Sequence, residues 1–413
     1  MPSFRTIAAL LACGIFFNAS AVDFSATETP RYYLVQVWQT DKGLPNNWVS
    51  SIAQTPDGYL WIGTRYGGLA RFDGVRFSQF NQLDTSELKD VQVEHLSVDA
   101  MGRLWIFMGN ESISGFFNGR FELFRPPRTE PHARLDHVLN VSPGSVLFAG
   151  EFPYLAMLSK TGAGQWSVLD PRSKINPDPR TFCLDESTNV WFVTVAHRLA
   201  CFSNNIFSFV TNDLHDANVA ALAVDAQKKL WIATSRHVIE RSGNDFLDRT
   251  PTNGPPPEAI VQIAFSGDGG LWVLERNRLR KIINGQWATE INSDELLMNS
   301  SPANISLHGD MQGNVWIVVN GRGLWHCKSD GSSHLLNEQT GLPSRFITCW
   351  FQDFEGNVWV GMHDGGLACI RERLFQAYGQ ADGLHDKVAS STCVDARGVL
   401  WAGTMSGSFA ALR

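Results

Sequence analysis

The stretch from Val49 to Phe80, VSSIAQTPDGYLWIGTRYGGLARFDGVRFSQF, contains four short apolar segments separated by turn residues. Turns are indicated at Pro56-Asp57-Gly58, at Tyr66-Gly67-Gly68 and at Asp73-Gly74. Short runs rich in β-branched and aromatic side chains, bounded by Gly, Pro and Asp, are typical of antiparallel strands. The stretch therefore predicts one four-stranded sheet, and such a sheet needs neighbours to bury its faces.

This unit recurs along the chain, and an aromatic residue marks the same place in each copy. The markers lie about 40 to 44 residues apart, with Phe148 in one copy and tryptophan in the others: Trp61, Trp105, Trp191, Trp231, Trp272, Trp316, Trp359 and Trp401. A repeat of roughly 40 to 45 residues with four strands is the mark of a β-propeller blade. We therefore predict an all-β fold, a β-propeller of four-stranded antiparallel blades with nine repeats, in which the tryptophans pack between neighbouring blades.

An aspartate precedes most of these tryptophans by six residues. It is present in six copies, as Asp99, Asp185, Asp225, Asp310, Asp353 and Asp395. The D-x-x-G-x-[LV]-W pattern predicts a tight turn that leads into a strand, with the aspartate bonded to the backbone of the turn. One carboxylate per turn is too few for calcium, which takes six or more oxygen ligands.

The sequence leaves the number of blades open. Gly341-Leu342-Pro343-Ser344 restates Gly43-Leu44-Pro45-Asn46 seven copies later. This restart predicts a seven-bladed propeller over residues 22–340, followed over residues 341–413 by repeats 8 and 9 as an incomplete second propeller. The alternative is a continuation of the first ring, closed by the N-terminal strand at 33–38, because the last copy lacks a fourth strand.

The N-terminus has the pattern of a signal peptide over residues 1–21. Arg5 precedes an apolar run over 7–17, and Asn18-Ala19-Ser20-Ala21 offers a small-residue cleavage site after Ala21. The mature chain is expected in the periplasm or outside the cell, with no membrane span. Six cysteines remain after cleavage, and free thiols are favoured because strands one and three of a sheet lie too far apart for a disulfide.

Composition narrows the classes of partner. The chain is 44% apolar and 18% charged, which is typical of a globular protein. Its net charge is −7 and its pI is about 5.9, so it offers no basic field for nucleic acid.

Over roughly residues 32 to 413 the chain resembles the two-component regulator propeller repeat, most specifically in copies one, eight and nine. The first copy does so through GLPNNWV at 43–49, DGYLWIGT at 57–64 and GLARFDG at 68–74, and the eighth through GLP at 341–343 and GNVWVG at 356–361. The resemblance implies the periplasmic sensor of a hybrid histidine-kinase system, with a small-molecule or oligosaccharide ligand. No kinase module is present in the sequence, so the expected protein partner is a membrane histidine kinase or the missing remainder of a longer sensor.

The loops that join strands two and three, and those that lead into each new blade, share one face of an antiparallel propeller. These loops vary between copies, and function on a rigid scaffold usually belongs to variable loops. Arginine suits carboxylates or sulfates, and aromatic faces suit sugar rings. The candidate ligand-binding residues are Asn46, Asn47, Trp48, Arg65, Tyr66, His197, Arg198, Arg236, His237, Arg276, Arg278, Arg322, Arg345, His363 and Asp364.

Two other functions remain open. One is a propeller lyase or hydrolase, in which His197, His237 or His363 acts with Glu111 or Glu275. The sequence has no H-x-x-x-H pair and no G-x-S-x-G motif, so we predict no catalytic residues, no metal site and no cofactor. The other is a protein-interaction scaffold that uses the flat face of the ring.

Overall fold

The computed structural model describes most of the chain in side-chain detail. The described residues are 33–124, 181–203, 206–210, 214, 218–292, 301, 304–373, 386, 388–396, 399–407 and 409–412, with the backbone alone of four strands between 135 and 168. The predicted signal peptide and its cleavage site lie outside this part of the chain. Within it, no helix is long and apolar enough to cross a membrane.

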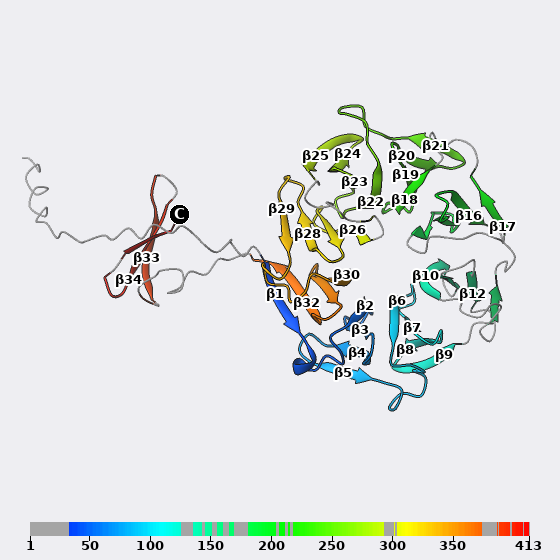
Figure 1. Ribbon diagram of the computed structural model, residues 1–413, viewed down its shortest axis with the longest axis horizontal. Helices are drawn as coiled ribbons and strands as arrows, with labels where there is room; N and C mark the ends of the chain where they lie inside the picture. The colour runs from blue at the N-terminus through cyan, green and yellow to red at the C-terminus, as the bar shows by residue number, and fades with distance from the viewer. Residues whose placement is uncertain are drawn as a thin grey trace, which may run out of the picture. The chain divides into compact units, whose positions relative to one another are not determined.

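The strands form eight four-stranded antiparallel sheets and one three-stranded sheet, which confirms the predicted all-β propeller. Figure 1 shows the four-stranded sheets arranged as blades around an axis, with one edge strand of each blade, its inner strand, nearest the centre. We number the sheets 1 to 9 in chain order. Sheets 1 to 4 are β2–β5 (Val49–Gln54, Leu60–Thr64, Gly68–Phe72, Phe77–Phe80), β6–β9 (Val93–Val98, Leu104–Met108, Ile113–Phe117, Arg120–Phe124), β10–β13 (Leu135–Ser142, Ser145–Gly150, Leu155–Ser159, Gln165–Val168) and β14–β17 (Cys183–Leu184, Val190–Val193, Leu199–Ser203, Ile206–Phe209).

The remaining sheets follow the same order, except that sheet 8 borrows its outer strand from the N-terminal side. Sheets 5 to 7 are β18–β21 (Val219–Val224, Leu230–Thr234, Val238–Ser242, Asp245–Asp248), β22–β25 (Ile260–Phe265, Leu271–Glu275, Arg278–Ile283, Gln286–Asn292) and β26–β29 (Ile305–Gly309, Val315–Val319, Gly323–Cys327, Ser333–Leu336). Sheet 8 is β30–β32 (Ile347–Gln352, Val358–Met362, Leu367–Glu372) with β1 (Tyr33–Trp38), and sheet 9 is β33–β35 (Ala389–Val394, Leu400–Thr404, Phe409–Leu412).

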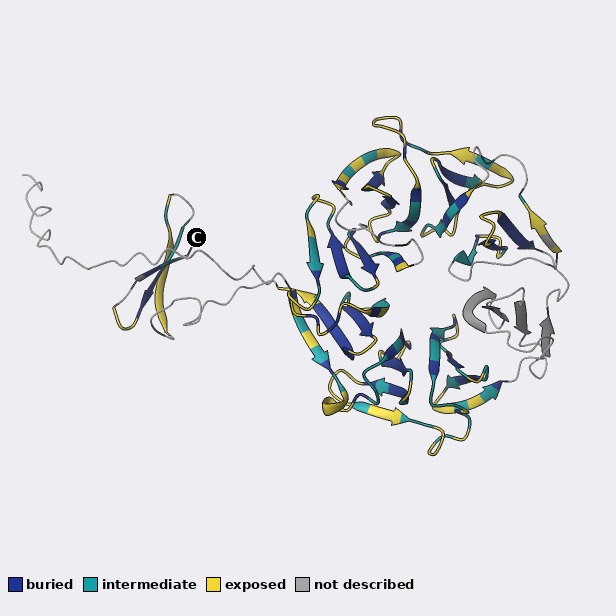
Figure 2. Cartoon of the chain, in the orientation of Figure 1, coloured by how far each residue is buried: buried dark blue, intermediate teal, exposed yellow. Residues whose placement is uncertain are grey.

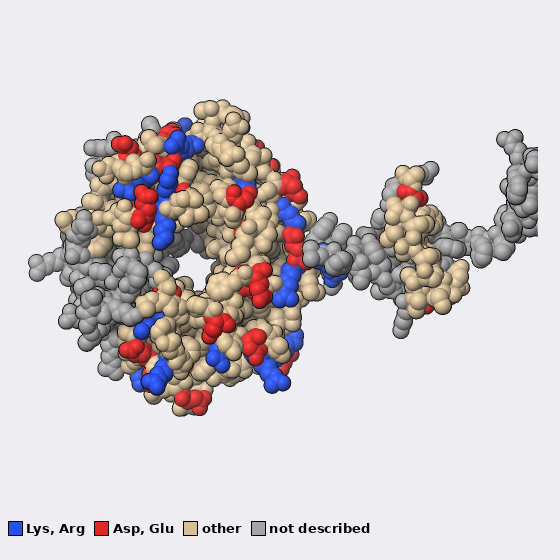
Figure 3. All heavy atoms as spheres, turned by 180° about the vertical axis from the view of Figure 1, so that it is seen from behind, with Lys and Arg blue, Asp and Glu red and all other residues tan. Residues whose placement is uncertain are grey.

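The ring closes where β1 pairs with β32. β2 of sheet 1 contacts β30 and β31 of sheet 8, so the first and eighth sheets are neighbours. Trp38 of β1 stacks on Trp359 at 5.4 Å and meets Phe72 edge-on at 5.1 Å, which joins the two sheets by aromatic packing. Eight sheets therefore form one ring, and Figure 3 shows the opening at its centre.

One compact unit spans Val35–Arg371, so its C-terminal limit falls between Arg371 and Glu372. The unit Val35–Arg371 holds sheets 1 to 8, and sheet 9 belongs to the other unit. In sheet 9 the first strand, β33, is exposed along its whole length. Whether repeat 9 begins a second propeller stays a prediction.

The turn aspartate explains the spacing of the repeat. Asp99 accepts hydrogen bonds through Oδ1 from the backbone N–H groups of Met101 and Arg103, both at 2.9 Å, as predicted. Its Oδ2 accepts a bond from the indole Nε1–H of Trp105 at 3.0 Å, which sequence reasoning missed. The same indole bond joins Asp185 to Trp191, Asp225 to Trp231, Asp310 to Trp316, Asp353 to Trp359 and Asp395 to Trp401. The motif is thus one hydrogen-bonded unit, which fixes the six-residue interval.

The tryptophan rings pack between sheets, as predicted. Trp61 is fully buried, and its ring lies 4.7 Å from that of Phe116 in sheet 2. In sheet 1, which lacks the aspartate, its indole donates instead to Thr55 Oγ1 at 2.9 Å. Figure 2 shows the same concentration of burial in the middle strands of the blades, and β3, β7, β23, β27 and β31 are buried throughout.

A β-bulge recurs at the second residue of the inner strand. The pairing register shifts there in sheets 1 and 8, between Val49 and Ser51 and between Ile347 and Cys349. The freed side chain reaches the neighbouring sheet, because the Ser50 hydroxyl donates to the Val93 carbonyl at 2.5 Å. A bulge re-aims a side chain in this way, and here it links blades around the axis.

The six cysteines of the described part are free thiols, as expected. Cys201, Cys327 and Cys369 are buried, whereas Cys393 in sheet 9 is exposed.

Candidate functional site

The strongest cluster of predicted residues lies where sheet 8 meets sheet 1. The ring of Trp48 lies 3.7 Å from that of His363, tilted by 42°. Tyr66 meets the same indole edge-on, with ring centroids 5.6 Å apart and an interplanar angle of 81°. The Arg65 guanidinium carbon lies 5.7 Å from the Trp48 ring centroid. We call these four residues the seam cluster, because His363 comes from the last blade of the ring and the others from the first.

The backbone around the seam cluster is fixed by hydrogen bonds. Arg65 N–H donates to the Trp48 carbonyl at 2.9 Å, which joins the two loops of sheet 1. Trp48 N–H donates to Asn46 Oδ1 at 2.8 Å, and Asn47 Oδ1 accepts from Thr40 N–H at 3.0 Å. The side-chain oxygens of Asn46 and Asn47 therefore hold the loop, and these two predicted residues act on Trp48 by positioning it.

Asn47 also ties the first blade to the last. Its carbonyl accepts a hydrogen bond from Gly366 N–H at 3.0 Å. On the other side, His363 N–H donates to the Phe346 carbonyl at 3.0 Å. Both loops that meet at the seam are thus held at their backbones, and the aromatic side chains are carried on a fixed support.

Arg65 is held by partners that sequence reasoning missed. Its Nη1 forms an ion pair with Glu94 Oε2, and Gln92 Nε2 donates to the other oxygen of the same carboxylate. Glu94 stands at the second residue of inner strand β6, where the register shifts between Val93 and His95. The same bulge position carries an uncharged residue in sheets 1, 5, 6 and 8 (Ser50, Ala220, Val261 and Thr348). A charged residue at this repeat position is the sequence signal that could have identified Glu94.

Exposure divides the seam cluster into a support and a contact surface. Tyr66 is 60% exposed and His363 is exposed, whereas Trp48 is half-buried. The Arg65 side chain is 28% exposed, and its Nε is buried without a hydrogen-bond partner. The cluster therefore presents two exposed aromatic side chains, Tyr66 and His363, beside a guanidinium whose charge is compensated by Glu94.

Three more of the predicted residues, from sheets 7 and 8, lie near Phe346 or next to His363. Arg345 is exposed, lies 5.6 Å from the Phe346 ring, and its Nε is 3.9 Å from Glu338. Arg322 is half-buried and follows Gly321, where an added Cβ would lie 3.5 Å from the Phe346 ring. Asp364 is exposed next to His363. These residues form a polar flank of the seam.

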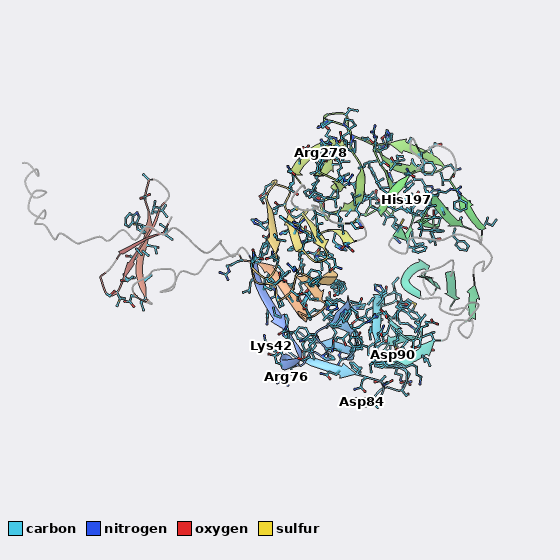
Figure 4. All side chains as sticks on the ribbon, viewed as in Figure 1. Lys42, Arg76, Asp84, Asp90, His197 and Arg278 are labelled. Atoms are coloured by element: carbon cyan, nitrogen blue, oxygen red, sulfur yellow. The ribbon has the colours of Figure 1, made fainter. Side chains whose placement is uncertain are left out.

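The predicted residues of sheets 4 and 5 interact mainly with their own surroundings. Arg198 lies 4.2 Å over the ring of Phe209, on the outer strand of its own sheet. His197, labelled in Figure 4, has φ of 58° and its Nδ1 lies 3.3 Å from the Val219 carbonyl. His237 Nδ1 lies 2.8 Å from Asp248 Oδ2 on the outer strand of sheet 5.

The electrostatics of sheet 5 agree with this pairing. Burial raises the pKa of Asp248, but hydrogen bonds from Thr250 and His237 outweigh it, so the pKa lies below its usual value. Arg236 is exposed. The three predicted histidines thus have different partners, and none of the described His, Cys, Asp and Glu side chains form a group of three or more that suits a metal ion.

Sheet 6 contains a second arginine cluster, and it is buried. Arg280 Nε donates to Glu275 Oε1 at 2.6 Å, and both side chains are fully buried. Arg278, labelled in Figure 4, reaches the other oxygen of Glu275 at 3.3 Å. The Arg280 guanidinium carbon lies 3.7 Å from the Trp287 ring centroid. We call Glu275, Arg278, Arg280 and Trp287 the sheet 6 cluster; of the predicted residues here, only Arg276 is exposed.

Comparison with protein families finds a match in two segments of the chain. The model of the family "Two component regulator propeller" matches residues 43–66 and 341–364. These two segments lie in sheets 1 and 8 and contain the whole seam cluster. No match was found among curated proteins.

One of the similar solved structures shares the fold with a TM-score above 0.5, at low sequence identity. The extracellular domain of a hybrid two component system from B. thetaiotaomicron is 19% identical, with 92% of this chain and 48% of that chain covered and a TM-score of 0.55. The extracellular domain of a one component system from the same organism is 16% identical, with 88% of this chain and 60% of that chain covered and a TM-score of 0.37. Virginiamycin B lyase from Staphylococcus aureus is 13% identical, with 83% of this chain and 100% of that chain covered and a TM-score of 0.49.

The chain spans about half the length of the first of these structures. At such identities the likeness shows the fold alone, and the family match rests on the two repeat segments. The chain is therefore a β-propeller in which two segments match the model of the two-component regulator propeller.

Proposed function

We propose that this propeller is the ligand-binding sensor module of a two-component signalling system, and that the ligand contacts the seam cluster. The observation that carries the proposal is the exposed aromatic surface of Trp48, Tyr66 and His363, which lies in the two segments that match the sensor family. Its rings come from loops whose backbones are bonded across two blades, so the surface is ready to bind without large rearrangement.

The chemistry of the cluster favours an uncharged ring as ligand, such as one sugar of an oligosaccharide. Aromatic faces bind the apolar face of a sugar ring by stacking. Arg65 is paired with Glu94, so an anionic ligand would have to compete with a carboxylate already in place. The polar flank, with Arg322 and Arg345, would then contact hydroxyl groups further along the ligand.

In this proposal the module binds and does not turn over its ligand. Signal output would come from a histidine kinase, on another chain or in a further part of the sensor, and the propeller would act in the periplasm or outside the cell. The hybrid two component system that shares this fold was solved as an extracellular domain, which supports the same placement for this chain.

A panel of neutral and anionic oligosaccharides, screened by thermal shift and followed by calorimetry, tests the proposal. We expect a neutral oligosaccharide to raise the melting temperature of the wild type, and Trp48→Ala and Tyr66→Ala to abolish the shift. Arg198→Ala is the matched control, because this loop arginine stacks on Phe209 of its own sheet and should leave binding unchanged.

Three outcomes contradict the proposal. One is a panel without any stabilising member, and another is equal loss of binding in Trp48→Ala and Arg198→Ala. The third is cleavage of the bound oligosaccharide over time, detected by chromatography, which would favour a propeller lyase or hydrolase.

A further inference from the structure

The end of the blades opposite to the seam cluster carries an arc of exposed apolar side chains. The turns that join strands one and two all lie at this end, because the strands are antiparallel. Phe354 is 62% exposed, Met311 53% and Met101 42%, and Pro56 is also exposed. Each stands one or two residues after the turn residue that receives the indole bond. These four residues belong to the consecutive blades 7, 8, 1 and 2, and we call them the turn arc.

Hydrogen bonds between blades hold these turns in a fixed arrangement. Met311 N–H donates to Gln352 Oε1 at 3.0 Å, and Phe354 N–H donates to Gln54 Oε1 at 2.8 Å. In both cases a glutamine that ends one inner strand holds the turn of the preceding blade. The backbone N–H groups of Met311 and Phe354 are thus bonded to the next blade, while their side chains are exposed to solvent.

The third junction of the arc is made by packing. A Cβ added at Gly102 would lie 2.8 Å from Pro56 Cγ, so the turns of sheets 1 and 2 are in direct contact. The four turns therefore form one continuous strip from Met311 to Met101.

The turns of sheets 4 and 5 lack this character. At the corresponding positions they carry Glu186-Ser187 and Ala226-Gln227-Lys228, all exposed. The scaffold of the turn is the same, because Asp185 and Asp225 make the same indole bonds as the other turn aspartates. The repeat therefore does not require an apolar residue here, and the turn arc distinguishes one part of the ring.

Carboxylates flank the turn arc and indicate the charge of its occupant. Asp57 follows Pro56, and Glu355 follows Phe354, and both are exposed. Neither takes part in an ion pair with any residue that the structure describes. A partner that places lysine or arginine next to an apolar side chain would pair with both features.

We propose that the turn arc is a docking surface for a short peptide segment of a partner protein, in which apolar side chains alternate with lysine or arginine. Four partly exposed side chains offer roughly 300 Å² of apolar surface, which is the size of a functional patch on a monomer. A stable dimer needs about 800 Å² from each partner, so a peptide fits the arc better than a second copy of the chain. This surface is separate from the proposed ligand site.

The test uses the full chain and fluorescein-labelled ten-residue peptides, with binding measured by fluorescence anisotropy at 0.15 M salt. One set alternates Lys or Arg with Phe or Leu; matched sets replace the basic residues by Glu or the apolar ones by Ala. We expect members of the first set to bind, and Phe354→Ser and Met311→Ser each to weaken binding at least tenfold. Gln227→Ser, in the sheet 5 turn, should not change it.

Thermal melts of each variant confirm that the ring is intact, and the milder Phe354→Leu should retain binding. Absence of binding by every basic–apolar peptide overturns the proposal, as does equal binding by the Glu set or by Phe354→Ser. A concentration-dependent dimer of the wild type that Phe354→Ser abolishes, seen by light scattering, would assign the arc to a second copy instead.

Discussion

The seam cluster, taken with the Glu94 partner of Arg65, and the sheet 6 cluster share an arginine, a glutamate and a tryptophan but differ in burial. Each pairs an arginine with a glutamate and sets the guanidinium near an indole: Arg65 with Glu94 and Trp48, and Arg280 with Glu275 and Trp287. Glu275 and Arg280 are 0% exposed, whereas the Arg65 and Glu94 side chains are 28% and 23% exposed.

The loop over each cluster accounts for this difference. In sheet 6 the segment before β22 covers the arginine, because the Pro255 carbonyl accepts from Arg280 Nη1 at 2.8 Å and Glu258 N–H donates to Glu275 at 2.7 Å. At the seam the corresponding loop carries Trp48 and leaves Tyr66 and His363 facing solvent. The same three residue types are therefore covered by a loop in sheet 6 and left partly open to solvent at the seam, where we propose that a ligand binds.

The largest expected effect is on the buried pair. Glu275→Gln should lower the free energy of unfolding by about 3 to 5 kcal/mol, because removal of one partner leaves a buried guanidinium uncompensated. Chemical denaturation monitored by tryptophan fluorescence measures it. The matched control, Glu94→Gln at the seam, should cost less than about 1 kcal/mol. Equal losses in the two variants would remove the distinction between the clusters.

The next effect is on binding at the open cluster. Trp48→Ala should weaken binding of the ligand identified by thermal shift, with a loss of binding free energy of about 2 kcal/mol or more, as is usual for a central aromatic contact. Trp287→Phe should leave the affinity unchanged, because that indole is covered by Arg280. Calorimetry compares the two variants. A similar loss of affinity in both would show that the effect comes through the scaffold.

Buried pairs should also make the ring sensitive to acid. Burial raises the pKa of Asp310, but His326 Nε2 at 3.3 Å and hydrogen bonds from the Asn314 backbone and from Trp316 outweigh it, so the pKa lies below its usual value. A carboxyl with a lowered folded-state pKa contributes stability above its unfolded pKa, about 3.9, and loses it as the pH falls through the folded value.

The variant that tests this point is His326→Gln. It should lower stability at pH 7 and flatten the loss of stability below about pH 4, since the folded-state pKa of Asp310 then moves upward. Melting temperatures measured from pH 7 to pH 3 follow both changes. An acid profile that is identical in the wild type and the variant would contradict the role assigned to this pair.

The variant with the smallest expected effect on stability, Glu94→Gln, should change the charge of the ligand that the seam cluster prefers. In Glu94→Gln the Arg65 guanidinium loses its compensating carboxylate, and an uncompensated arginine binds carboxylates or sulfates. We expect the variant to gain affinity for anionic oligosaccharides and to keep its affinity for neutral ones. The thermal-shift panel with both classes provides the measurement, and an unchanged preference would mean that Arg65 does not face the ligand.

Much of the fold could be predicted from the sequence because its determinants are local. The Asp-to-Trp interval is set by one hydrogen-bonded turn, as in Asp99 and Trp105, so it recurs wherever the turn does. The number of blades depends on the pairing of β1 with β32, residues more than 300 positions apart. A repeat pattern carries no information about such a long-range closure.

Repeat position predicts which loops share a face of the propeller, but not which partners their side chains contact. Repeat position predicts Trp48, Tyr66 and His363 on one face, and in the structure their rings contact one another. It put Arg198 and His237 there too, yet their partners, Phe209 and Asp248, stand on outer strands. Which neighbour a loop side chain meets depends on the twist of the sheet and on the next blade, and neither can be deduced from spacing.

The most direct test of the account is 19F NMR of the chain labelled with 5-fluorotryptophan, titrated with the oligosaccharide that raises the melting temperature most. Trp48→Phe and Trp287→Phe assign the two resonances. The account predicts that the Trp48 resonance shifts with the ligand concentration while that of Trp287 stays in place. A shift confined to Trp287, or no shift at Trp48 at saturation, would contradict the claim that the open cluster at the seam is the ligand site.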